Sequence, residues 1–584
     1  MIPKRFLLLS LLLPLSCATV EPKLPSPNVI VIITDDQGYG DLSCHGNPVL
    51  RTPWLDRLHA ESLRLTDFHV SAMCTPTRGQ LLTGRDALAN GAMNVSSGRT
   101  LLRSEIPTIA DDFAANGYAT GQFGKWHLGE NYPYRPHDRG FQEAVYFPSS
   151  HISSAPDYWN NDYFDDHYRH NGEWKAYRGY CTDVFFGEAM SWMKTCAERR
   201  RPFFTYLALN APHGPLYVPR KYREPYKSQS PNVASFFGMI ANIDENMGKL
   251  DAFLREHGLR DNTILVWMTD NGGTTGVPVY NAGMRGKKID LYEGGHRVPC
   301  FIRWPSGKLG APRDLSELTE CQDLFPTLRD LCGLEKSVVA RFDGISLARL
   351  LRGETNGLGD RKLVVQFSRM NAPEPSKGDA AVLWKRWRLI QDKELYDLRT
   401  DPAQTTNVID QHREVAREMR AHYEDWWSQV SRRVNEFAPV TIGSPAEPVT
   451  VLSPCEWQDV FLDQSRQVRA GESKNGVWNL NVPVRADYEI SLRRWPIEAD
   501  VPIASGVPAY EATDGRFIEG KALPVAKARL RIAQVDEGRP VAKDTVAATF
   551  TVTLPPGPAQ LQTWFLDAED KPLCGAYYVY VRRK

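Results

Sequence analysis

The chain has 584 residues, of which 42% are hydrophobic and 24% are charged, as in ordinary globular proteins. Lys and Arg together number 70, and so do Asp and Glu, so the formal net charge is zero. This balance excludes a protein that is drawn to nucleic acid or to anionic membrane by its overall charge, and the length allows about two to four domains.

The N-terminus carries a targeting pattern. Two basic residues precede "FLLLSLLLPL", an apolar run that is too short for a membrane span but typical of a secretory leader. The pattern predicts a signal peptide over residues 1–18, with cleavage after Ala18, and export to the periplasm or the medium. Alternatively, "LPLSC" resembles an imperfect bacterial lipobox that would lipidate Cys17, although Pro14 weakens it. No other stretch reads as a transmembrane helix.

Cysteines are numerous enough for disulfides in an exported chain. The sequence does not define their pairing. The candidates are Cys44, Cys181, Cys196, Cys300, Cys321, Cys332, Cys455 and Cys574.

Residues 26–360 show the pattern of an α/β domain. The apolar runs "NVIVIITDD" (28–36) and "NTILVWMTDN" (262–271) suit buried parallel strands. Helical periodicity lies between them, at 108–117 and 236–258. Alternation of strands and helices predicts a doubly wound, mostly parallel sheet.

Beyond this domain the pattern changes twice. Residues 380–408 favour short antiparallel strands and 413–430 an amphipathic helix, which predicts a small subdomain over 361–436. From residue 437 the chain is rich in Pro and Val with alternating apolar residues, as in "YEISLRRWP" and "TFTVTLPPGP". This predicts an added β-sandwich over residues 437–584.

Acidic and amide residues follow both of the apolar runs. Asp35 and Asp36 end the first run, and Asp270 and Asn271 end the second. In an α/β sheet the carboxyl ends of the strands form the ligand-binding edge. Either pair alone is ordinary for a loop or a helix cap, but oxygen donors at two strand ends indicate a Ca²⁺ or Mg²⁺ site.

The stretch "CTPTRGQLLTGR" (74–85) has the signals of a short helix. Pro76 suits the first turn and Gly84 suits the end. Cys74 is therefore placed beside free backbone N–H groups at the positive end of the helix dipole, where anions bind. Arg78 adds a cation one turn later. The alternative for Cys74 is an ordinary buried thiol or half of a disulfide.

Further cationic side chains occur in short motifs. "GKWH" spaces Lys125 and His127 by two, which predicts that both lie on the same side of a strand. "APHGP" places His213 in a stiff turn, and "GKKIDLYEGGHRVP" brings lysines after the second apolar run. One such residue alone is usually structural. Several cations with a divalent metal and a helix N-terminus indicate an anionic substrate such as sulfate or phosphate.

These motifs together resemble the type I sulfatases. "CTPTRGQLLTGR" is similar to the family signature, Cys-X-Pro-Ser/Ala/Thr-Arg followed by Leu-Thr-Gly-Arg. "TDDQGYGD", "GKWHLG", "APHGP", "TDNGG" and "GKKIDLYEGGHRVP" resemble its other blocks in the right order, and "ELYDLRTDPAQTTN" resembles its C-terminal subdomain. The resemblance covers roughly residues 27–435. It implies an alkaline-phosphatase-like fold and hydrolysis of sulfate esters.

The resemblance also implies a nucleophile. In that family a dedicated maturase oxidises the signature cysteine, here Cys74, to formylglycine, an aldehyde that is hydrated at rest. One hydroxyl of the hydrate would attack sulfur and displace the alcohol. His127 would then take the proton from the second hydroxyl as sulfate leaves.

The remaining roles follow from the same resemblance. His213 and Lys288 would bind the sulfate and protonate the leaving oxygen, and Lys288, unlike Lys287, keeps the spacing of the family before Glu293. Lys125 and Arg78 would hold the diol. The implied metal is one calcium ion, with the ligands Asp35, Asp36, Asp270, Asn271 and residue 74.

Two other functions remain open at this point. A phosphodiester or phosphonate monoester hydrolase can use the same aldehyde, and residues 437–584 could belong to a non-catalytic glycan-binding protein. The complete metal and cation set argues against the second.

Sulfated glycans and aryl sulfates both remain as substrates, and the loop at 151–174 has aromatics that either stack on sugars or pack internally. Because no candidate catalytic residue follows residue 437, we expect that region to fold separately and to assist binding of an extended substrate.

Overall fold

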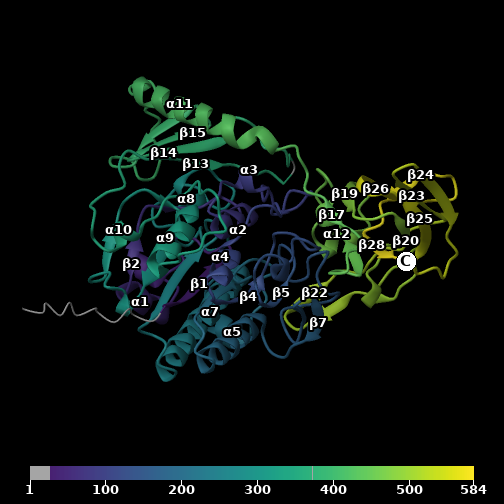
Figure 1. Ribbon diagram of the computed structural model, residues 1–584, viewed down its shortest axis with the longest axis horizontal. Helices are drawn as coiled ribbons and strands as arrows, with labels where there is room; N and C mark the ends of the chain where they lie inside the picture. Colours follow the sequence, from purple (N-terminus) through teal and green to yellow (C-terminus); the bar gives the residue numbers. More distant parts are fainter. Residues whose placement is uncertain (1–25, 371) are drawn as a thin grey trace, which may run out of the picture.

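The computed structural model describes residues 26–370 and 372–584 (Figure 1). The predicted leader over residues 1–18, with Cys17, lies outside the described residues. Within the described ranges, no helix has both the length and the apolar character needed to cross a membrane.

A ten-stranded sheet forms the centre of the larger part of the molecule. Its five middle strands are parallel, and antiparallel strands join at both sides, with β10 (Cys300–Arg303) on β9 and β6 (His167–His170) on β5. This arrangement confirms the predicted mostly parallel α/β sheet. In spatial order the parallel strands are β9 (Thr263–Thr269), β1 (Asn28–Thr34), β8 (Phe203–Ala208), β4 (Ala119–Lys125) and β5 (Glu143–Phe147). The other strands of this sheet are β2 (Leu63–Leu65), β7 (Glu173–Ala176) and β11 (Arg313–Leu315).

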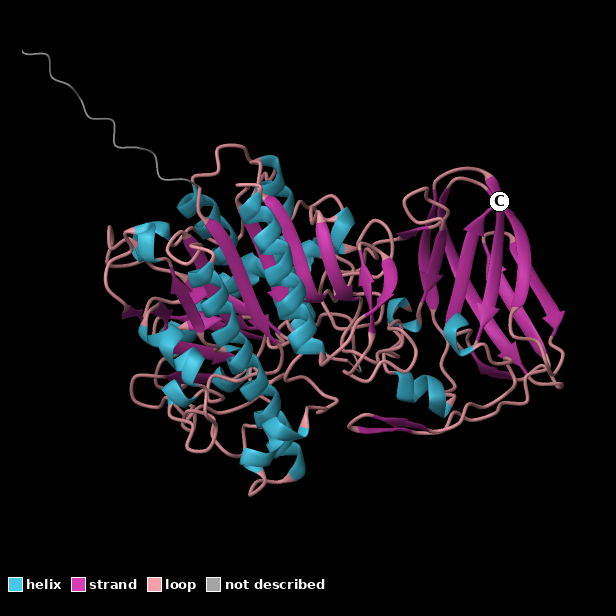
Figure 2. Ribbon diagram, turned by 90° about the horizontal axis from the view of Figure 1, so that it is seen from below, coloured by secondary structure: helices cyan, strands magenta, loops and turns pink. Residues whose placement is uncertain are grey.

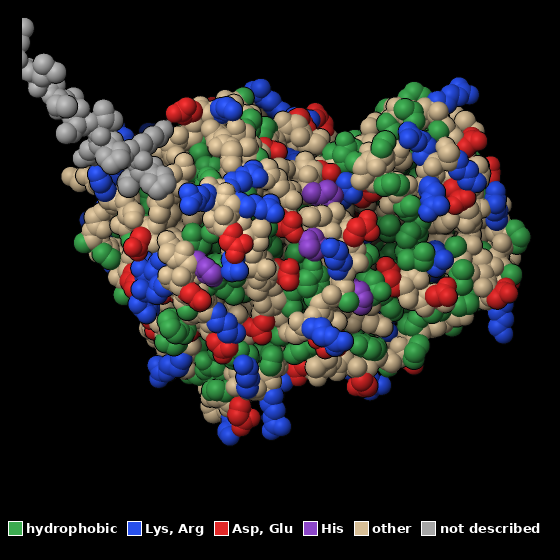
Figure 3. All heavy atoms as spheres, turned by 60° about the horizontal axis from the view of Figure 1, so that its bottom comes forward, with side chains coloured by type: hydrophobic (Ala, Val, Ile, Leu, Met, Phe, Trp, Pro, Cys, Tyr) green, Lys and Arg blue, Asp and Glu red, His purple; other side chains and the backbone are tan. Residues whose placement is uncertain are grey.

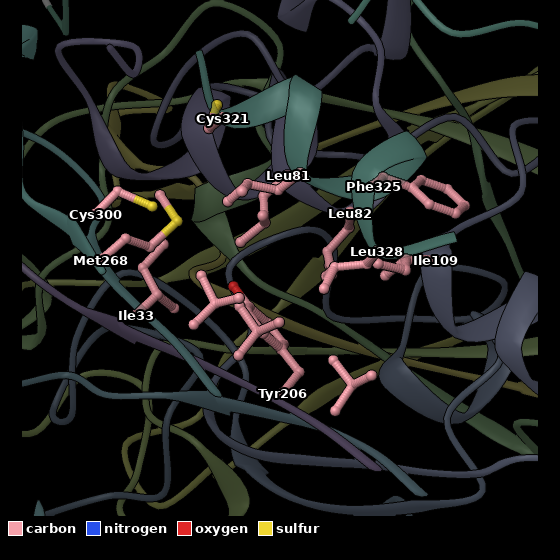
Figure 4. Packing of buried hydrophobic residues seen from close by; sticks show 14 of the residues in the cluster. Ile33, Leu81, Leu82, Ile109, Tyr206, Met268, Cys300, Cys321, Phe325 and Leu328 are labelled. Carbon is pink, nitrogen blue, oxygen red and sulfur yellow. The ribbon is translucent and has the colours of Figure 1, made fainter. Parts of the chain in front are cut away.

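Helices cover both faces of this sheet, which explains the continuous apolar runs. Alternate residues of β1 belong to two separate hydrophobic clusters, with Val31 and Ile33 in one and Ile30 and Ile32 in the other. The first cluster contains α2 (Cys74–Thr83), α4 (Ile109–Ala115) and α9 (Leu324–Cys332). The second contains α1 (Pro53–Ala60), α5 (Cys181–Glu198) and α7 (Pro231–Glu256). Figure 4 shows the first layer, where Leu81, Leu82 and Leu328 gather above strand residues such as Ile33.

The predicted helices are present with one difference in extent. α4 matches the pattern at 108–117, and Thr108 caps it by accepting a hydrogen bond from the Asp111 N–H. α7 begins at Pro231, before the predicted start at residue 236, because Ser230 caps it and Pro231 is tolerated in the first turn.

A four-stranded antiparallel sheet follows the central domain. α11 (Arg413–Val430) packs on this sheet through residues such as Met419 and Tyr423. Figure 1 shows the helix lying along the sheet beside β15 and β14. These elements confirm the strands and the helix that we predicted here. The strands are β13 (Lys362–Gln366), β14 (Ala380–Trp384), β15 (Trp387–Ile390) and β16 (Glu394–Asp397).

The C-terminal region contains two further β-sheets, which lie beside the α/β part (Figures 1 and 2). The β-rich fold is confirmed, whereas the boundary at residue 437 stays a prediction. One sheet consists of β17 (Val440–Thr441), β19 (Val477–Val482), β26 (Gly557–Leu566), β23 (Lys527–Ile532) and β24 (Val535–Pro540), with β27 (Pro572–Cys574) paired to β26. The other consists of β18 (Val449–Leu452), β28 (Tyr578–Arg583), β20 (Ala486–Arg493) and β25 (Ala548–Leu554). In addition, β21 (Tyr510–Ala512) and β22 (Gly515–Phe517) form a small two-stranded sheet.

The core of this β-rich region is continuous with side chains of the α/β part. Leu101, Tyr134 and Ala155 belong to the same buried cluster as the interior of the two sheets. The Tyr578 hydroxyl donates a hydrogen bond to the Ala155 carbonyl over 2.9 Å. Trp159 packs against Trp495, with ring centroids 5.6 Å apart. The two parts are therefore joined by a packed apolar contact.

No disulfide links the nine cysteines that the structure describes. Seven of the nine are buried, in separate places such as the layer under α9 for Cys300 and the C-terminal sheets for Cys574. Because buried thiols behave as small apolar groups, these cysteines contribute to the packing of the interior.

Candidate active site

The polar residues that follow four adjacent parallel strands meet at one edge of the sheet. Thr34 pairs with Thr269 at the ends of β1 and β9, so Asp35 and Asp270 become neighbours. β8 and β4 lie on the other side of β1 and end at the same edge. The predicted residues brought together in this way are Asp35, Asp36, Asp270, Asn271, His213, Lys125 and His127.

Cys74 is the first residue of α2, and the helix ends where Gly84 adopts a left-handed φ of 64°. Pro76 lies in the first turn, where its missing N–H leaves no bond unmade. The Cys74 sulfur and carboxylate oxygens of Asp35 and Asp270 lie within 4.8 Å of one another. Burial raises the pKa of the Cys74 thiol, so the unmodified residue is protonated and a poor nucleophile.

Three cations pair with the three carboxylates. Arg78 donates to Asp270 Oδ2 from Nη2 over 2.8 Å and from Nε over 3.1 Å. Lys125 Nζ lies 2.5 Å from Asp35 Oδ2. Lys288 Nζ pairs with Asp36 Oδ1.

These pairings decide the charge of the carboxylates. Burial alone would raise the pKa of Asp35, but Lys125, followed by His213 and Arg78, holds it well below the ordinary value. Asp270 responds differently, because burial and the charge of Asp35 raise its pKa to about 6. Two carboxylates that repel one another at such short range favour a site that also takes a cation.

The donor set fits a hard divalent cation. Asp35 Oδ1 and Asn271 Oδ1 are both buried and have no hydrogen-bond partner within the described chain. Asn271 is oriented by a 3.0 Å hydrogen bond from Nδ2 to Asp36 Oδ1, which leaves its carbonyl oxygen free. Asp36 has a φ of 64°, a strained conformation for a residue other than glycine, as is common at functional sites. Carboxylate and amide oxygens are ligands that Ca²⁺ and Mg²⁺ prefer.

The two predicted histidines differ in their free nitrogen. His127 Nε2 lies 2.9 Å from the Val95 carbonyl, which can only accept, so the hydrogen is on Nε2. Nδ1 is left buried with no hydrogen-bond partner within the described chain. Burial, reinforced by Lys125, lowers the pKa of His127 well below the ordinary value, so Nδ1 is an unprotonated base.

The prediction that His127 lies on the strand beside Lys125 is wrong. β4 ends at Lys125, and Trp126 then enters the core. His127 follows with a φ of 59°, and this left-handed conformation turns the chain at the edge of the sheet. This turn brings the His127 side chain to the site, and the alternation of side chains along a strand does not contribute.

His213 is nearer to the solvent. Its Nε2 lies 3.9 Å from Asp36 Oδ2, and its side chain is 21% exposed. Its Nδ1 lies 2.6 Å from the Gly214 carbonyl, which accepts the hydrogen bond. Burial lowers the pKa of His213, and Asp36 acts in the opposite direction.

A pocket of about 540 Å³ opens over Cys74. It contains predicted residues together with several that the sequence analysis missed. The missed residues include Met73, Val95, Ser150, His151, Thr274, Thr275, Ile289, Met370, Phe461, Asp463 and Gln464.

The loop at 151–174 takes only a small part in this pocket. His151 lines it and stacks on His213, with ring centroids 5.7 Å apart. Tyr158 instead stacks on His167, and Trp159 packs on the β-rich region. Most of these aromatics therefore pack internally.

The sheet edge, the metal-type donor set and the cationic pocket define a hydrolase of anionic esters. Comparison with known proteins identifies the family. Residues 27–334 match the family described as Sulfatase, and residues 283–429 match N-sulphoglucosamine sulphohydrolase, C-terminal. The chain belongs to the sulfatase family and is by class a sulfuric ester hydrolase.

Individual relatives agree with this membership. Human (Homo sapiens) arylsulfatase A is 32% identical over 406 residues, which cover 65% of this chain and 78% of that enzyme. N-acetylgalactosamine-6-sulfatase of Canis lupus familiaris is 29% identical, and the match covers 56% of this chain and 66% of that enzyme. A crystal structure of Ps i-CgsB in complex with k-i-k-neocarrahexaose has a TM-score of 0.64 at 25% identity, covering 70% of this chain and 95% of that one. Both family matches end before residue 430.

Proposed function

We propose that this protein hydrolyses sulfate esters of glycans or aryl alcohols through a matured Cys74. One observation carries the proposal: Cys74 begins a buried helix within reach of the Asp35 and Asp270 carboxylates, at the floor of a pocket that also presents His213 and Lys288. Formylglycine at position 74 would supply, as its hydrate, one hydroxyl for attack on sulfur and a second for release of the product.

The side chains around position 74 have distinct tasks. Lys288 and His213 line the pocket, and there they would hold the sulfate. The negative charge of the bound sulfate would favour protonation of His213 at Nε2, and the imidazolium would then give this proton to the leaving oxygen. His127 Nδ1 is buried, unprotonated and free, as a base that takes a proton during release of sulfate requires. Lys125 and Arg78 fix the carboxylates and would orient the hydroxyls at position 74.

The metal in this proposal is one calcium ion. The residues that would hold it are Asp35, Asp36, Asp270, Asn271 and residue 74. A bound divalent cation supplies positive charge that polarises the attacking oxygen and offsets the charge of the sulfate. Arg78 and Lys125 already neutralise part of the carboxylate charge, which keeps the donors together at the strand ends.

Maturation and export complete the proposal. Cys74, Pro76 and Arg78 are the residues that a formylglycine-generating maturase would read. Export to the periplasm or the medium rests on the leader pattern of residues 1–18, with lipid attachment at Cys17 as the alternative. A phosphodiester or phosphonate monoester hydrolase is the competing activity, and membership of the sulfatase family argues for sulfate.

The test uses the full chain produced together with a maturase. The mass of the peptide that contains residue 74 should be that of formylglycine, and the protein should release sulfate from 4-nitrophenyl sulfate faster than it cleaves 4-nitrophenyl phosphonate or phosphodiesters. Cys74→Ser should keep the melting temperature and lose turnover, whereas Cys196→Ser, a buried cysteine away from the site, should keep both. Rapid multiple turnover by protein with an unmodified Cys74 thiol would refute the proposal. Faster phosphonate cleavage would establish the competing activity.

A further inference from the structure

The β-rich C-terminal region supplies one side of the pocket over Cys74. Phe461, Asp463 and Gln464 line the pocket although they lie beyond both family matches. Phe461 packs against Met73, Cys74 and Val95. The segment that carries these residues precedes α12 (Ser465–Ala470).

This segment is held in place from two sides. The Ala155 N–H donates a 2.6 Å hydrogen bond to the Asp463 carbonyl, and Ser154 forms a β-bridge with Gln464. On the other side, the Asp463 N–H donates to Gln467 Oε1 over 3.2 Å. Since the backbone of Asp463 is fixed by both parts of the molecule, its side chain has a defined position in the pocket.

The Asp463 carboxylate has one oxygen without a partner. The residue is 4% exposed, and its Oδ1 forms no hydrogen bond within the described chain. A buried acceptor that lacks a donor is unfavourable, so a ligand that brings a hydroxyl or an N–H group is bound preferentially. Burial raises the pKa of Asp463 to about 6, while Ser150 and Lys125 act to lower it, so the group is mainly ionised near neutral pH.

A carboxylate is unsuited to the sulfate itself. The ammonium groups of Lys125 and Lys288 and the imidazole of His213 gather around position 74 for that anion, and a carboxylate would repel it. Asp463 must therefore act on the rest of the substrate. The neighbouring lining is partly apolar, with Met73, Val95, Ile289, Met370 and Phe461. An apolar surface beside one strong acceptor suits a sugar ring, which has C–H faces and hydroxyl edges.

We propose that Asp463 determines specificity by accepting a hydrogen bond from a hydroxyl or N–H group of the sugar that carries the sulfate ester. This inference rests on the proposed function and extends it to residues that the appended region contributes. Asp463 touches only the alcohol part of the ester, so it takes no part in sulfur chemistry.

The test compares two substrates in the full, matured chain. Asp463→Ala should lower kcat/KM for the 6-sulfate of an uncharged hexose by about 10–100-fold, chiefly through KM, because a hydrogen bond to a charged acceptor is lost. The same variant should change 4-nitrophenyl sulfate hydrolysis little, because that ring offers no donor. Asp463→Asn keeps the shape and one acceptor oxygen, so its loss on the hexose sulfate should be smaller than that of Asp463→Ala.

Asp459→Ala is the matched control. Asp459 lies in the same segment, but its carboxylate pairs with Arg99 over 2.8 Å and does not line the pocket. Its removal should affect both substrates equally. Equal losses on both substrates in Asp463→Ala and Asp463→Asn would overturn the inference and leave the sulfatase function intact. A wild-type protein that hydrolyses aryl sulfates and no sugar sulfate would have the same two consequences. A wild-type protein that releases sulfate from neither substrate would overturn both.

Discussion

His127 and His213 show how two residues of one type come to lie in different environments of one site. The Val95 carbonyl fixes the tautomer of His127 and leaves a buried basic nitrogen, whereas His213 is partly exposed in the pocket where an alcohol would leave. A nitrophenolate leaves readily without a proton, but a sugar alkoxide needs one. The two histidines should therefore respond differently to the leaving group.

His213→Ala should lower kcat/KM for a hexose sulfate by about 10²–10⁴-fold and for 4-nitrophenyl sulfate by much less. His127→Ala should give a burst of released alcohol with either substrate and leave sulfate on the protein, because it acts after the alcohol has left. Stopped-flow absorbance and intact-protein mass spectrometry measure these effects. Equal losses on both substrates in His213→Ala, with no retained sulfate in His127→Ala, would show that the roles are assigned wrongly.

Lys287 and Lys288 offer a second comparison at this scale. Both line the pocket, but only Lys288 pairs with Asp36, and its side chain is 15% exposed. Lys288→Ala should lower kcat/KM by about 10²–10³-fold, as expected for a group that stabilises developing charge. Lys287 is exposed, and Lys287→Ala should change kcat/KM by no more than about fivefold. Steady-state rates on 4-nitrophenyl sulfate decide between them, and a larger loss in Lys287→Ala would exchange the two roles.

At the scale of elements, the strand before Lys125 depends on a glycine. Gly124 has a φ of 103°, and a Cβ there would lie 2.0 Å from the Ala208 carbonyl oxygen of β8. Gly117 also has a positive φ, 87°, but a Cβ there would meet nothing within 4 Å. Both positions have a positive φ, but only Gly124 is buried within a strand, and only there would a Cβ collide with the neighbouring backbone.

Gly117→Ala should therefore cost about 1–2 kcal/mol of stability, the ordinary penalty of a left-handed residue, and leave activity unchanged. Gly124→Ala should lower the melting temperature further, because β4 must move away from β8, and should reduce activity by displacing Lys125 from Asp35. Thermal unfolding and kcat measure the two effects. Equal melting temperatures in the two variants would contradict this interpretation of the contact.

At the scale of the whole molecule, charge is spread evenly and the pocket is shared between regions. Figure 3 shows acidic and basic side chains interspersed over one face, in line with the zero formal net charge. Phe461 and Asp463 reach the pocket from the C-terminal region, and Met370 reaches it from the segment after β13. Substrate selection can therefore depend on residues far from the catalytic motifs in sequence.

This sharing changes the outcome expected from truncation. If the C-terminal region only assisted binding of extended substrates, a chain ending at residue 436 would still hydrolyse small ones. That chain, however, would lose Phe461 from the cluster that contains Cys74 and would uncover Leu101, Tyr134 and Ala155. We therefore expect it to lose most of its activity even on 4-nitrophenyl sulfate and to melt at a lower temperature. Full activity of a folded truncated chain on this substrate would show that the C-terminal wall is dispensable for small esters.

Much of the fold was predictable because it depends on local pattern. The apolar runs at 28–36 and 262–271 became β1 and β9, and the helix at 413–430 became α11, since periodicity and burial go together. The strand ends of a parallel sheet converge by topology, so the strand pattern was enough to place Asp35 and Asp270 together. His127 was placed on the wrong element, because a left-handed turn at that position has no signal in "GKWH".

The sequence predicted which residues form the candidate site, because the ends of parallel strands and a helix start converge at one edge of the sheet and because the motifs resemble those of the sulfatases. The tertiary structure alone decided which nitrogen of His127 is free, that His151 joins His213, and that Asp463 enters the pocket. The physical reason is distance along the chain. The hydrogen bond of Ala155 with Asp463 and the packing of Phe461 on the Met73, Cys74 and Val95 cluster join segments hundreds of residues apart, and only the packing of the β-rich region against the α/β part brings them together.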